Sequence, residues 1–392
     1  MDKTRVMFVT GTRADYGKIK RLTLAVEAAE VYELHLFISG MHLSRVHGST
    51  YQQVLKDGYK NTKLAWGTED STRMDVNLAQ TIIQLSDYVA QVQPQFLVVH
   101  GDRIDALAGA IVCMLNNIRC IHIEGGEVTG TVDDSIRHAI SKMAHYHLVS
   151  NEEAQIRLQQ LGEPVGNIFV IGSPDIDVML SDDLPPLEQV RERYGIPFER
   201  YAIMIYHPVV TEQDRLKEKI EAVVDATLLS EKNYVVIYPN NDLGSAVILG
   251  ALEKLRANAR YRLYRSLDFE EFLVLLRHSE FIIGNSSAGV REACVYGVPC
   301  IDVGSRQHDR YPARGLANII HVEEDTHAIL AQMEKIDDQR QCSFYYGTGN
   351  SCQQFMQTLQ ELARRKDAVQ KKFVDTSETQ AAIDVYINEV LF

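Results

Sequence analysis

The sequence predicts an α/β protein with two doubly wound, Rossmann-like domains that face each other across a cleft. Three observations support this fold class: short apolar runs rich in Val and Ile recur along the chain, amphipathic helical patterns separate them, and a polar segment divides the series into two of similar size. Buried strands joined by amphipathic helices are typical of parallel sheets that are covered on both faces. The length of 392 residues also suggests two or three domains.

The first series of elements lies in residues 1–182, which we assign to an N-terminal domain. Its predicted strands are Arg5–Thr10, Glu33–Ser39, Gln95–His100, Arg119–Ile123, Tyr146–Ser150 and Ile168–Ile171. Its predicted helices are Lys18–Ala29, Met74–Gln91, Ile104–Leu115, Asp134–Ala144 and Glu152–Leu161.

The second series follows the segment 181–186, which reads SDDLPP and is the predicted linker. We assign residues 187–375 to a C-terminal domain. Its predicted strands are Tyr201–Tyr206, Tyr234–Tyr238, Arg260–Tyr264, Glu280–Ile283, Cys300–Val303 and Ile319–Val322. Its predicted helices are Glu212–Leu229, Ser245–Ala257, Phe269–Arg277, Gly289–Tyr296 and Thr326–Lys335. The tail from Cys352 to Phe392 has a helical pattern throughout.

The composition excludes several classes of protein. The hydrophobic fraction of 45% is too high for a mostly disordered chain, and the formal net charge of −13 disfavours a nucleic-acid binder, which would usually be basic. The longest apolar stretch, Ala106–Leu115, is far shorter than the roughly 20 residues of a membrane span. The apolar stretch at the N-terminus is too short for a signal peptide. We therefore expect a cytoplasmic protein whose cysteines are mostly reduced core thiols.

Acidic residues follow the predicted strands of the first domain. Asp102 follows the strand that ends at His100, Glu124 follows the next strand, and Asp133 lies at the start of the helix after it. Because the carboxyl ends of parallel strands lie at one edge of a sheet, these acids should share a crevice. Their mutual repulsion should raise the pKa of at least one, which gives a general acid beside a base. The alternative is that Asp102 is a turn residue and that Asp133 or Asp134 caps the helix.

Histidines also cluster in this part of the sequence. Their spacing matches no metalloprotease motif, and only oxygen donors and scattered imidazoles accompany them. We therefore expect no metal site, and we expect the imidazoles to hydrogen-bond the carboxylates or an anion. The histidines are His100, His122, His138, His145 and His147.

A second group of candidate residues lies in the stretch Gly284–Ala293, which reads GNSSAGVREA. A strand is predicted to end at Gly284 and a helix to begin near Ser287. The exposed N–H groups there, with the hydroxyls of Ser286 and Ser287, would form a phosphate cradle. Glu292 could accept two hydrogen bonds from a ribose diol. Alternatively, a serine caps this helix and Glu292 only complements the helix dipole.

Three further residues are candidates for contact with an anionic ligand. Arg13 lies in the loop between the first strand and its helix, and Arg306 lies in a loop of the second domain. Each could bind a phosphate or could be a solvated surface arginine. His207 follows the strand Tyr201–Tyr206, so it should face the cleft from the second domain, although it could simply be a turn residue before Pro208.

Three motifs resemble those of the hydrolysing UDP-N-acetylglucosamine 2-epimerases, which make N-acetylmannosamine for sialic acid synthesis. The motifs are HGDRIDALA at His100–Ala108, IHIEGGEVTGTVDDSIRHAISKMAHYH at Ile121–His147, and GNSSAGVREA. The similarity extends from the GTRADY segment to the helical tail. It implies a GT-B-like fold, with UDP held mainly by the second domain and with no metal or nicotinamide cofactor. It also implies that the C-terminal helices cross back, so that a helix over 376–392 packs on the first domain.

The resemblance also implies roles for individual residues. The catalytic residues would be Asp102, Glu124, Asp133 and His207. The UDP-binding residues would be Arg13, Phe272, Ser286, Ser287, Glu292 and Arg306. Further contacts to the substrate would come from Arg103, Arg137 and His145. The implied partners are a UDP-sugar substrate and the UDP product, without nucleic acid or membrane, in a homodimer or a dimer of dimers.

The family reaction explains why several carboxylates are needed. UDP leaves C1 by elimination as a base removes the C2 proton, and water then adds to the 2-acetamidoglucal while an acid protonates C2 on the opposite face. The expected substrate is UDP-N-acetylglucosamine. The alternative is UDP-2,4-diacetamido-2,4,6-trideoxyglucose, on the way to legionaminic acid. An alternative from another class is a GT-B glycosyltransferase or a nucleotide-sugar binding module.

Overall fold

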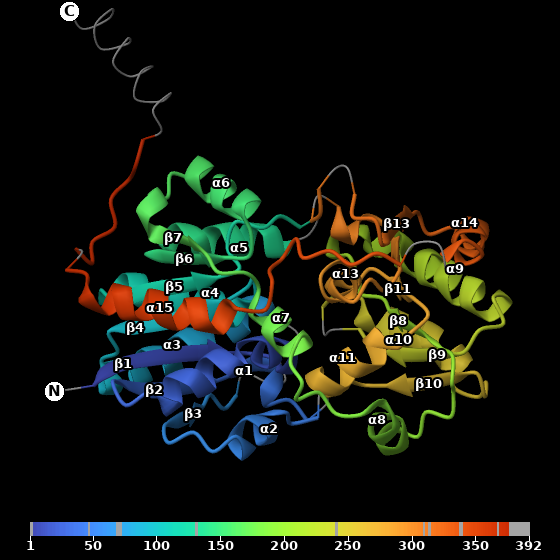
Figure 1. Cartoon of the computed structure of the whole chain (residues 1–392), viewed down its shortest axis with the longest axis horizontal. Coiled ribbons are helices and arrows are strands. Elements are labelled where there is room, and N and C mark those ends of the chain that lie inside the picture. Colours follow the sequence, from blue (N-terminus) through green and yellow to red (C-terminus); the bar gives the residue numbers. More distant parts are fainter. Residues whose placement is uncertain are drawn as a thin grey trace, which may run out of the picture.

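The computed structural model contains two α/β domains that lie side by side along the long axis of the molecule (Figure 1). Each domain is built on one parallel sheet with helices on both faces, so the predicted fold class is confirmed. The structure describes residues 3–45, 48–67, 73–129, 132–239, 242–308, 310–312, 315–336, 340–366 and 368–375.

The first domain has a seven-stranded sheet in the order β3-β2-β1-β4-β5-β6-β7. The strands are β1 (Thr4–Thr10), β2 (Tyr32–Ile38), β3 (Thr62–Leu64), β4 (Phe96–His100), β5 (Arg119–Ile123), β6 (Tyr146–Val149) and β7 (Ile168–Val170). Its helices are α1 (Arg13–Ala28), α2 (Tyr51–Lys56), α3 (Met74–Val92), α4 (Ile104–Asn116), α5 (Val132–Met143) and α6 (Glu152–Gln160).

Alternate residues of each strand belong to the two cores of this domain, as a pleated strand requires. In β1, Phe8 packs in a core with α1, whereas Met7 and Val9 pack in a core with α3 and α4. Both sets are almost fully buried. Because both faces of the central strands are covered, these strands are largely apolar, and this is why their positions could be predicted from the sequence.

The second domain has a six-stranded sheet in the order β10-β9-β8-β11-β12-β13. The strands are β8 (Ala202–Ile205), β9 (Tyr234–Ile237), β10 (Tyr261–Tyr264), β11 (Ile282–Gly284), β12 (Cys300–Val303) and β13 (Ile319–Val322). Its helices are α8 (Leu187–Tyr194), α9 (Leu216–Leu229), α10 (Ser245–Leu252), α11 (Phe269–Arg277), α12 (Ser287–Val290), α13 (Glu292–Val295) and α14 (Thr326–Met333). The predicted helix Gly289–Tyr296 is therefore divided into α12 and α13 at Arg291.

The chain crosses between the domains through α7 (Pro174–Met179) and α15 (Ser351–Arg364), which contact each other. The apolar side chains of α7 pack in a core of the second domain. In contrast, Phe355 of α15 packs in a core of the first domain, with its ring centroid 5.9 Å from that of Phe8. The return of the chain to the first domain therefore begins with α15.

The prediction of an entirely helical tail is wrong. Helix α15 ends at Arg364, and the described residues from 365 to 375 are not helical. The reason lies in Lys371, whose ammonium group donates to the carbonyl oxygens of Lys142 and Ala144, at 2.7 and 2.6 Å, where α5 ends. These hydrogen bonds use the unpaired carbonyls of a helix end and hold the tail extended against the first domain. The predicted helix over 376–392 lies outside the described residues.

Sequence patterns also missed the short elements β3, α2, α7 and α8. Each contains at most eight residues, too few for a periodic pattern. Within the part of the chain that the structure describes, no helix is long and apolar enough to cross a membrane.

Replacing Phe355 by Ala should lower the free energy of unfolding of the first domain. The side chain is fully buried, and removing a buried Phe costs about 3–5 kcal/mol through lost burial and a residual cavity. Urea unfolding followed by circular dichroism would measure the change. Gln360→Ala, on the exposed side of the same helix, is the control and should change the midpoint little. A similar midpoint for both variants would show that α15 does not stabilise the domain.

Candidate active site

A cavity of about 380 Å³ lies between the two domains. All strands are parallel, and the order in which they follow one another across the sheet reverses between β1 and β4 in the first sheet and between β8 and β11 in the second. Loops at the carboxyl ends of these four strands line the cavity, through Thr12, Asp102, His207 and Ser286. Such reversal points are where open α/β sheets bind ligands, because adjacent loops diverge there and leave a crevice.

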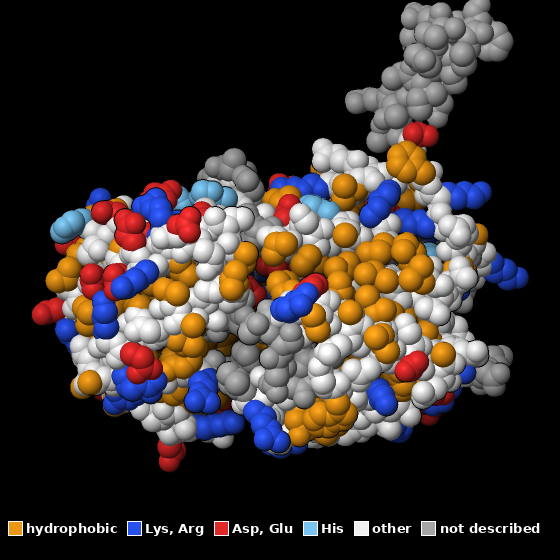
Figure 2. Space-filling view, turned by 180° about the vertical axis from the view of Figure 1, so that it is seen from behind, with side chains coloured by type: hydrophobic (Ala, Val, Ile, Leu, Met, Phe, Trp, Pro, Cys, Tyr) orange, Lys and Arg blue, Asp and Glu red, His pale blue; other side chains and the backbone are white. Residues whose placement is uncertain are grey.

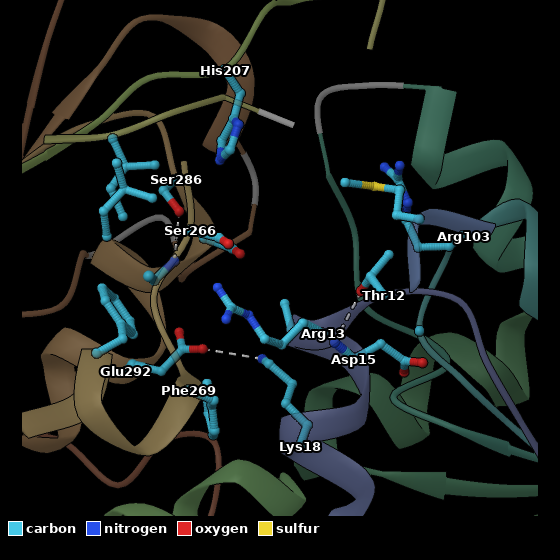
Figure 3. A pocket seen from close by; sticks show the side chains of 18 of the residues that line it. Thr12, Arg13, Asp15, Lys18, Arg103, His207, Ser266, Phe269, Ser286 and Glu292 are labelled. Carbon is cyan, nitrogen blue, oxygen red and sulfur yellow. Dashed lines mark hydrogen bonds and ion pairs between the residues drawn. The ribbon is translucent and has the colours of Figure 1, made fainter. Parts of the chain in front are cut away.

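The structure brings together nearly all the residues that the sequence pointed to. Those that line the cavity are Arg13, Asp102, Arg103, Glu124, Asp133, Arg137, His207, Phe272, Ser286, Ser287, Glu292 and Arg306. They come from both domains and face each other across the cavity, as Figure 3 shows for Arg103 and His207.

His145 is the exception, because it does not line this cavity. It precedes β6, so it lies at the amino end of that strand, away from the edge that faces the cavity. Its Nδ1 atom accepts from the backbone N–H of Cys120 at 3.1 Å, and its Nε2 atom lies 2.7 Å from the carbonyl oxygen of Val369. His145 therefore holds the extended tail on the first domain.

Arg291 connects the two domains. It lies between α12 and α13 and is only 2% exposed. Its guanidinium group lies 2.5 Å from carboxylate oxygens of both Glu124 and Glu127, which belong to the first domain. The same group lies over the ring of Tyr346, 4.7 Å from the centroid. These contacts balance a buried cation that would otherwise be costly.

Glu124 is held as a carboxylate by this arrangement. Burial favours its neutral form, but the charges of Arg291, His100 and Lys18 outweigh burial and hold the pKa of Glu124 well below its ordinary value. Its backbone has a φ of 63°, in the left-handed region that non-glycine residues seldom adopt. Strain of this kind is kept where the surroundings fix a residue, often at a functional site.

His100 lies between two carboxylates. Its Nδ1 atom is 2.8 Å from Asp15 and its Nε2 atom is 3.3 Å from Glu124. Burial alone would lower the pKa of His100, but these two carboxylates raise it to about 10. The imidazole is therefore a cation at neutral pH.

Asp102 and Asp133 have opposite pKa shifts. Burial would raise the pKa of Asp102, but Arg137, with which it forms an ion pair, and the nearby Arg310 lower it to about 2. The pKa of Asp133 is raised, first by burial and then by the charge of Asp102. The pair therefore offers one ionised carboxylate and one carboxyl group that retains its proton more readily, which is the arrangement of an acid and a base.

On the second domain, Ser286 caps α12 by accepting from the N–H of Ala288 at 3.3 Å, and it also lines the cavity. The capping and ligand-binding interpretations of this serine are thus compatible. His207 is half-buried, and its partial removal from water, together with the charges of Arg306 and Arg103, holds the pKa of His207 well below its ordinary value. Its imidazole is neutral at neutral pH and can accept or donate a proton.

Lys18 was not predicted, yet it joins the two sides of the cavity. Its ammonium group lies 3.2 Å from Glu292 of the second domain (Figure 3) and 2.9 Å from Asp175 of α7. The sequence did contain a signal for Lys18, because Lys18 follows Asp15 by three residues. Asp15 lies in the first turn of α1, where its N–H donates to the capping side chain of Thr12 at 3.1 Å. Residues three apart lie on the same face of a helix. Arg291 and Arg310 were also missed, although Arg291 lies within the GNSSAGVREA motif.

The sequence matches the protein family described as UDP-N-acetylglucosamine 2-epimerase over residues 24–360. It is 42% identical to a UDP-N-acetylglucosamine 2-epimerase of Neisseria meningitidis serogroup B over 95% of this chain and 99% of the relative. It is 30% identical to a UDP-N,N'-diacetylbacillosamine 2-epimerase (hydrolyzing) of Legionella pneumophila over 91% of this chain and 96% of the relative. A crystal structure of a Neisseria meningitidis UDP-GlcNAc 2-epimerase bound to UDP-GlcNAc has a TM-score of 0.79 with 19% identity, covering 91% of this chain and all of that one. At that identity, the likeness shows the fold alone.

Because the pKa of His100 is raised, the contribution of His100 to the free energy of unfolding should depend on pH. The cation stabilises the fold fully below the ordinary histidine pKa of 6.5, and this stabilisation is lost as pH rises through about 10. The difference in unfolding free energy between the wild type and His100→Gln should therefore shrink between pH 6.5 and 10, by at most about 1.4 kcal/mol per pH unit. Unfolding with urea at several pH values would measure it.

His327→Gln is the control, since His327 is exposed on α14, and its difference from the wild type should not vary with pH in this way. A constant difference for His100→Gln would mean that His100 is not held as a cation.

Proposed function

The chain belongs to the UDP-N-acetylglucosamine 2-epimerase family, and we propose that it is a hydrolysing 2-epimerase, which converts UDP-N-acetylglucosamine and water to N-acetylmannosamine and UDP for nonulosonic acid biosynthesis. The observation that carries this proposal is the pair Asp102 and Asp133, whose pKa values are shifted apart in a cavity between two nucleotide-binding-type domains. A reaction that both removes and delivers a proton at one carbon needs such a pair.

The name of one relative supports the hydrolysing form of the reaction. The Legionella pneumophila protein, 30% identical, is described as hydrolyzing and as acting on UDP-N,N'-diacetylbacillosamine. That sugar is the 2,4-diacetamido-2,4,6-trideoxyglucose of our alternative. The relative named for UDP-N-acetylglucosamine is 42% identical, which favours that substrate for this chain.

UDP would be bound mainly by the second domain. Ser286 and Ser287 present hydroxyls and backbone N–H groups at the start of α12, and Arg306 adds a fork of donors for a phosphate. Phe272 would lie beside the uracil. The Oε1 atom of Glu292 pairs with Lys18, whereas its buried Oε2 atom has no hydrogen-bond partner within the described part of the chain. That oxygen is placed to accept from a ribose hydroxyl.

The reaction then follows from the charges around the sugar. A base removes the C2 proton, the C1–O bond breaks with its electrons passing to UDP, and a C1=C2 double bond forms. Asp102, ionised beside Arg137, would stabilise the positive charge that develops at C1. Arg13 would neutralise charge on the departing diphosphate. Water then adds at C1 while an acid protonates C2 from the opposite face.

Asp133 is the side chain best suited to one of these proton transfers. Its pKa is raised, whereas Glu124 is fixed in ion pairs with Arg291 and His100. Glu124 therefore maintains the charge balance and shape of the site. On the second domain, the neutral imidazole of His207 is the side chain whose chemistry suits the other proton transfer.

The proposed function is tested by NMR of the products formed from UDP-N-acetylglucosamine in deuterated water, with no acceptor added. We expect free N-acetylmannosamine that carries deuterium at C2, together with UDP. A product in which UDP remains attached to the sugar would show a non-hydrolysing epimerase. No reaction without an acceptor would favour a transferase or binding module. A higher kcat/KM for UDP-2,4-diacetamido-2,4,6-trideoxyglucose would instead identify the alternative substrate.

The same assay examines Asp133. In Asp133→Asn, turnover should fall by about 10²–10⁴, the usual worth of a positioned acid or base, while calorimetry should find UDP affinity little changed. Asp87→Asn, an exposed carboxylate on α3, is the matched control and should retain normal turnover. Near-normal turnover of Asp133→Asn would assign proton transfer to another group.

We also propose that the protein forms a homodimer or a dimer of dimers through the first domain. Helices α3 and α4 cover the sheet face opposite α1 and contact each other, and Ile83 and Leu115 on them are 63% and 69% exposed. Figure 2, which shows the molecule from behind, has hydrophobic side chains gathered over this domain. Sedimentation equilibrium should find an oligomer that Leu115→Glu weakens. Leu229→Glu, at an exposed leucine of the second domain, is the control, and a monomeric wild type would contradict the proposal.

A further inference from the structure

We propose that the second domain carries a binding site for Zn²⁺, or a transition-metal ion of similar preference, formed by His308, His321 and Glu323. One ligand atom from each side chain lies within 4.8 Å of the other two. Within the described residues, this is the one group of His, Cys, Asp or Glu side chains that converges in this way. None of its members lines the cavity between the domains, so the site is separate from the proposed catalytic chemistry.

Two of the three distances between the ligand atoms are close to those around a tetrahedral ion, and the third is within 4.8 Å. The Nε2 atoms of His308 and His321 are 3.5 Å apart, and the Nε2 atom of His321 is 3.7 Å from Glu323 Oε1. Two imidazole nitrogens bound to Zn²⁺ at the usual bond length and tetrahedral angle lie about 3.3 Å apart. The rings of His308 and His321 meet edge to face at 60° rather than stacking, so their nitrogens converge on one point.

A buried carboxylate orients one of the ligands. Asp302 on β12 is fully buried, and its Oδ2 atom lies 3.4 Å from the Nδ1 atom of His321. This hydrogen bond places the proton on Nδ1 and leaves the Nε2 lone pair directed at His308. Metal-binding histidines almost always donate their second ring N–H to a carboxylate, carbonyl or water in this manner. Tyr311 donates to the same carboxylate oxygen at 3.1 Å and helps fix it.

The backbone supplies a suitable frame. His321 and Glu323 are two residues apart at the end of edge strand β13, so their side chains leave the same face. His308 follows a short helical turn after β12, and the N–H of Gly304 at the start of that turn donates to the carbonyl of Val322 at 2.8 Å. The turn also carries Arg306, which lines the cavity. An ion here would therefore tie the segment bearing Arg306 to the edge of the sheet.

The ligand set indicates the class of ion. Two imidazoles and one carboxylate suit Zn²⁺, whereas Mg²⁺ prefers oxygen ligands in octahedral geometry. With three protein ligands, water would complete the coordination. Because the three side chains are exposed, the ion should exchange with solvent and be removable by a chelator.

The test uses the full chain without a histidine tag, stripped with EDTA and dialysed. Calorimetric titration with ZnCl₂ should find a site that His308→Ala and His321→Ala each abolish, lowering the zinc stoichiometry by one. Asp302→Asn keeps the side-chain shape but removes the charge, and it should weaken zinc binding about 10–100-fold. His327→Ala, at an exposed histidine of α14 in the same domain, is the matched control and should leave the site intact.

Thermal unfolding gives a second readout. ZnCl₂ should raise the Tm of the wild type by mass action and should not raise that of His308→Ala, while MgCl₂ should have little effect on either. Since His308 is exposed, its removal should leave the circular dichroism spectrum unchanged, which keeps the test valid even if Asp302→Asn fails to fold. Unchanged zinc stoichiometry and affinity in both histidine variants would overturn the proposal. EDTA should leave turnover of UDP-N-acetylglucosamine intact well below Tm.

Discussion

The buried contact between Arg291 and the carboxylates Glu124 and Glu127 is the interaction on which the cavity depends. Arg291 belongs to the second domain and the two glutamates to the first, and all three are almost fully buried. A buried cation without its partners is costly, so the packing of the two domains against each other and the charge balance of Arg291 depend on each other. Glu124 itself lines the cavity, so the contact that joins the two domains also fixes part of the wall of the site.

The same contact determines the protonation states around it. Arg291 keeps Glu124 ionised, and ionised Glu124 in turn keeps His100 a cation. Lys18 extends the network to Glu292 on the second domain. The charged side chains of this network are therefore already held in place by their ion pairs, rather than being flexible groups that a ligand must first order. The cost of arranging these charges is met during folding.

The sheets and the strand-end residues of the site follow from local patterns in the sequence, whereas the crossing of the chain back to the first domain was implied by the family resemblance. Asp102, Glu124 and His207 could be placed because they follow buried strands, and parallel strands bring their carboxyl ends to one edge. The same rule places His145 away from the cavity, because His145 precedes its strand. Partners such as Arg291 and Glu124, 167 residues apart, carry no local signal, since their pairing exists only once two domains have packed together. The prediction of a helical tail was wrong for a similar reason, because the conformation of the tail is set by hydrogen bonds to the end of α5.

The pairing of Asp102 and Asp133 has one further consequence for the proposed reaction. The pKa of Asp133 is already raised by burial and by the charge of Asp102. Bound UDP would add negative charge across the cavity, and a nearby negative charge raises the pKa of a carboxyl group. Substrate binding would then help Asp133 to retain its proton, and release of UDP would lower its pKa again. The nucleotide would thus act on the acid as well as being the leaving group, which couples the order of proton transfer to the presence of UDP.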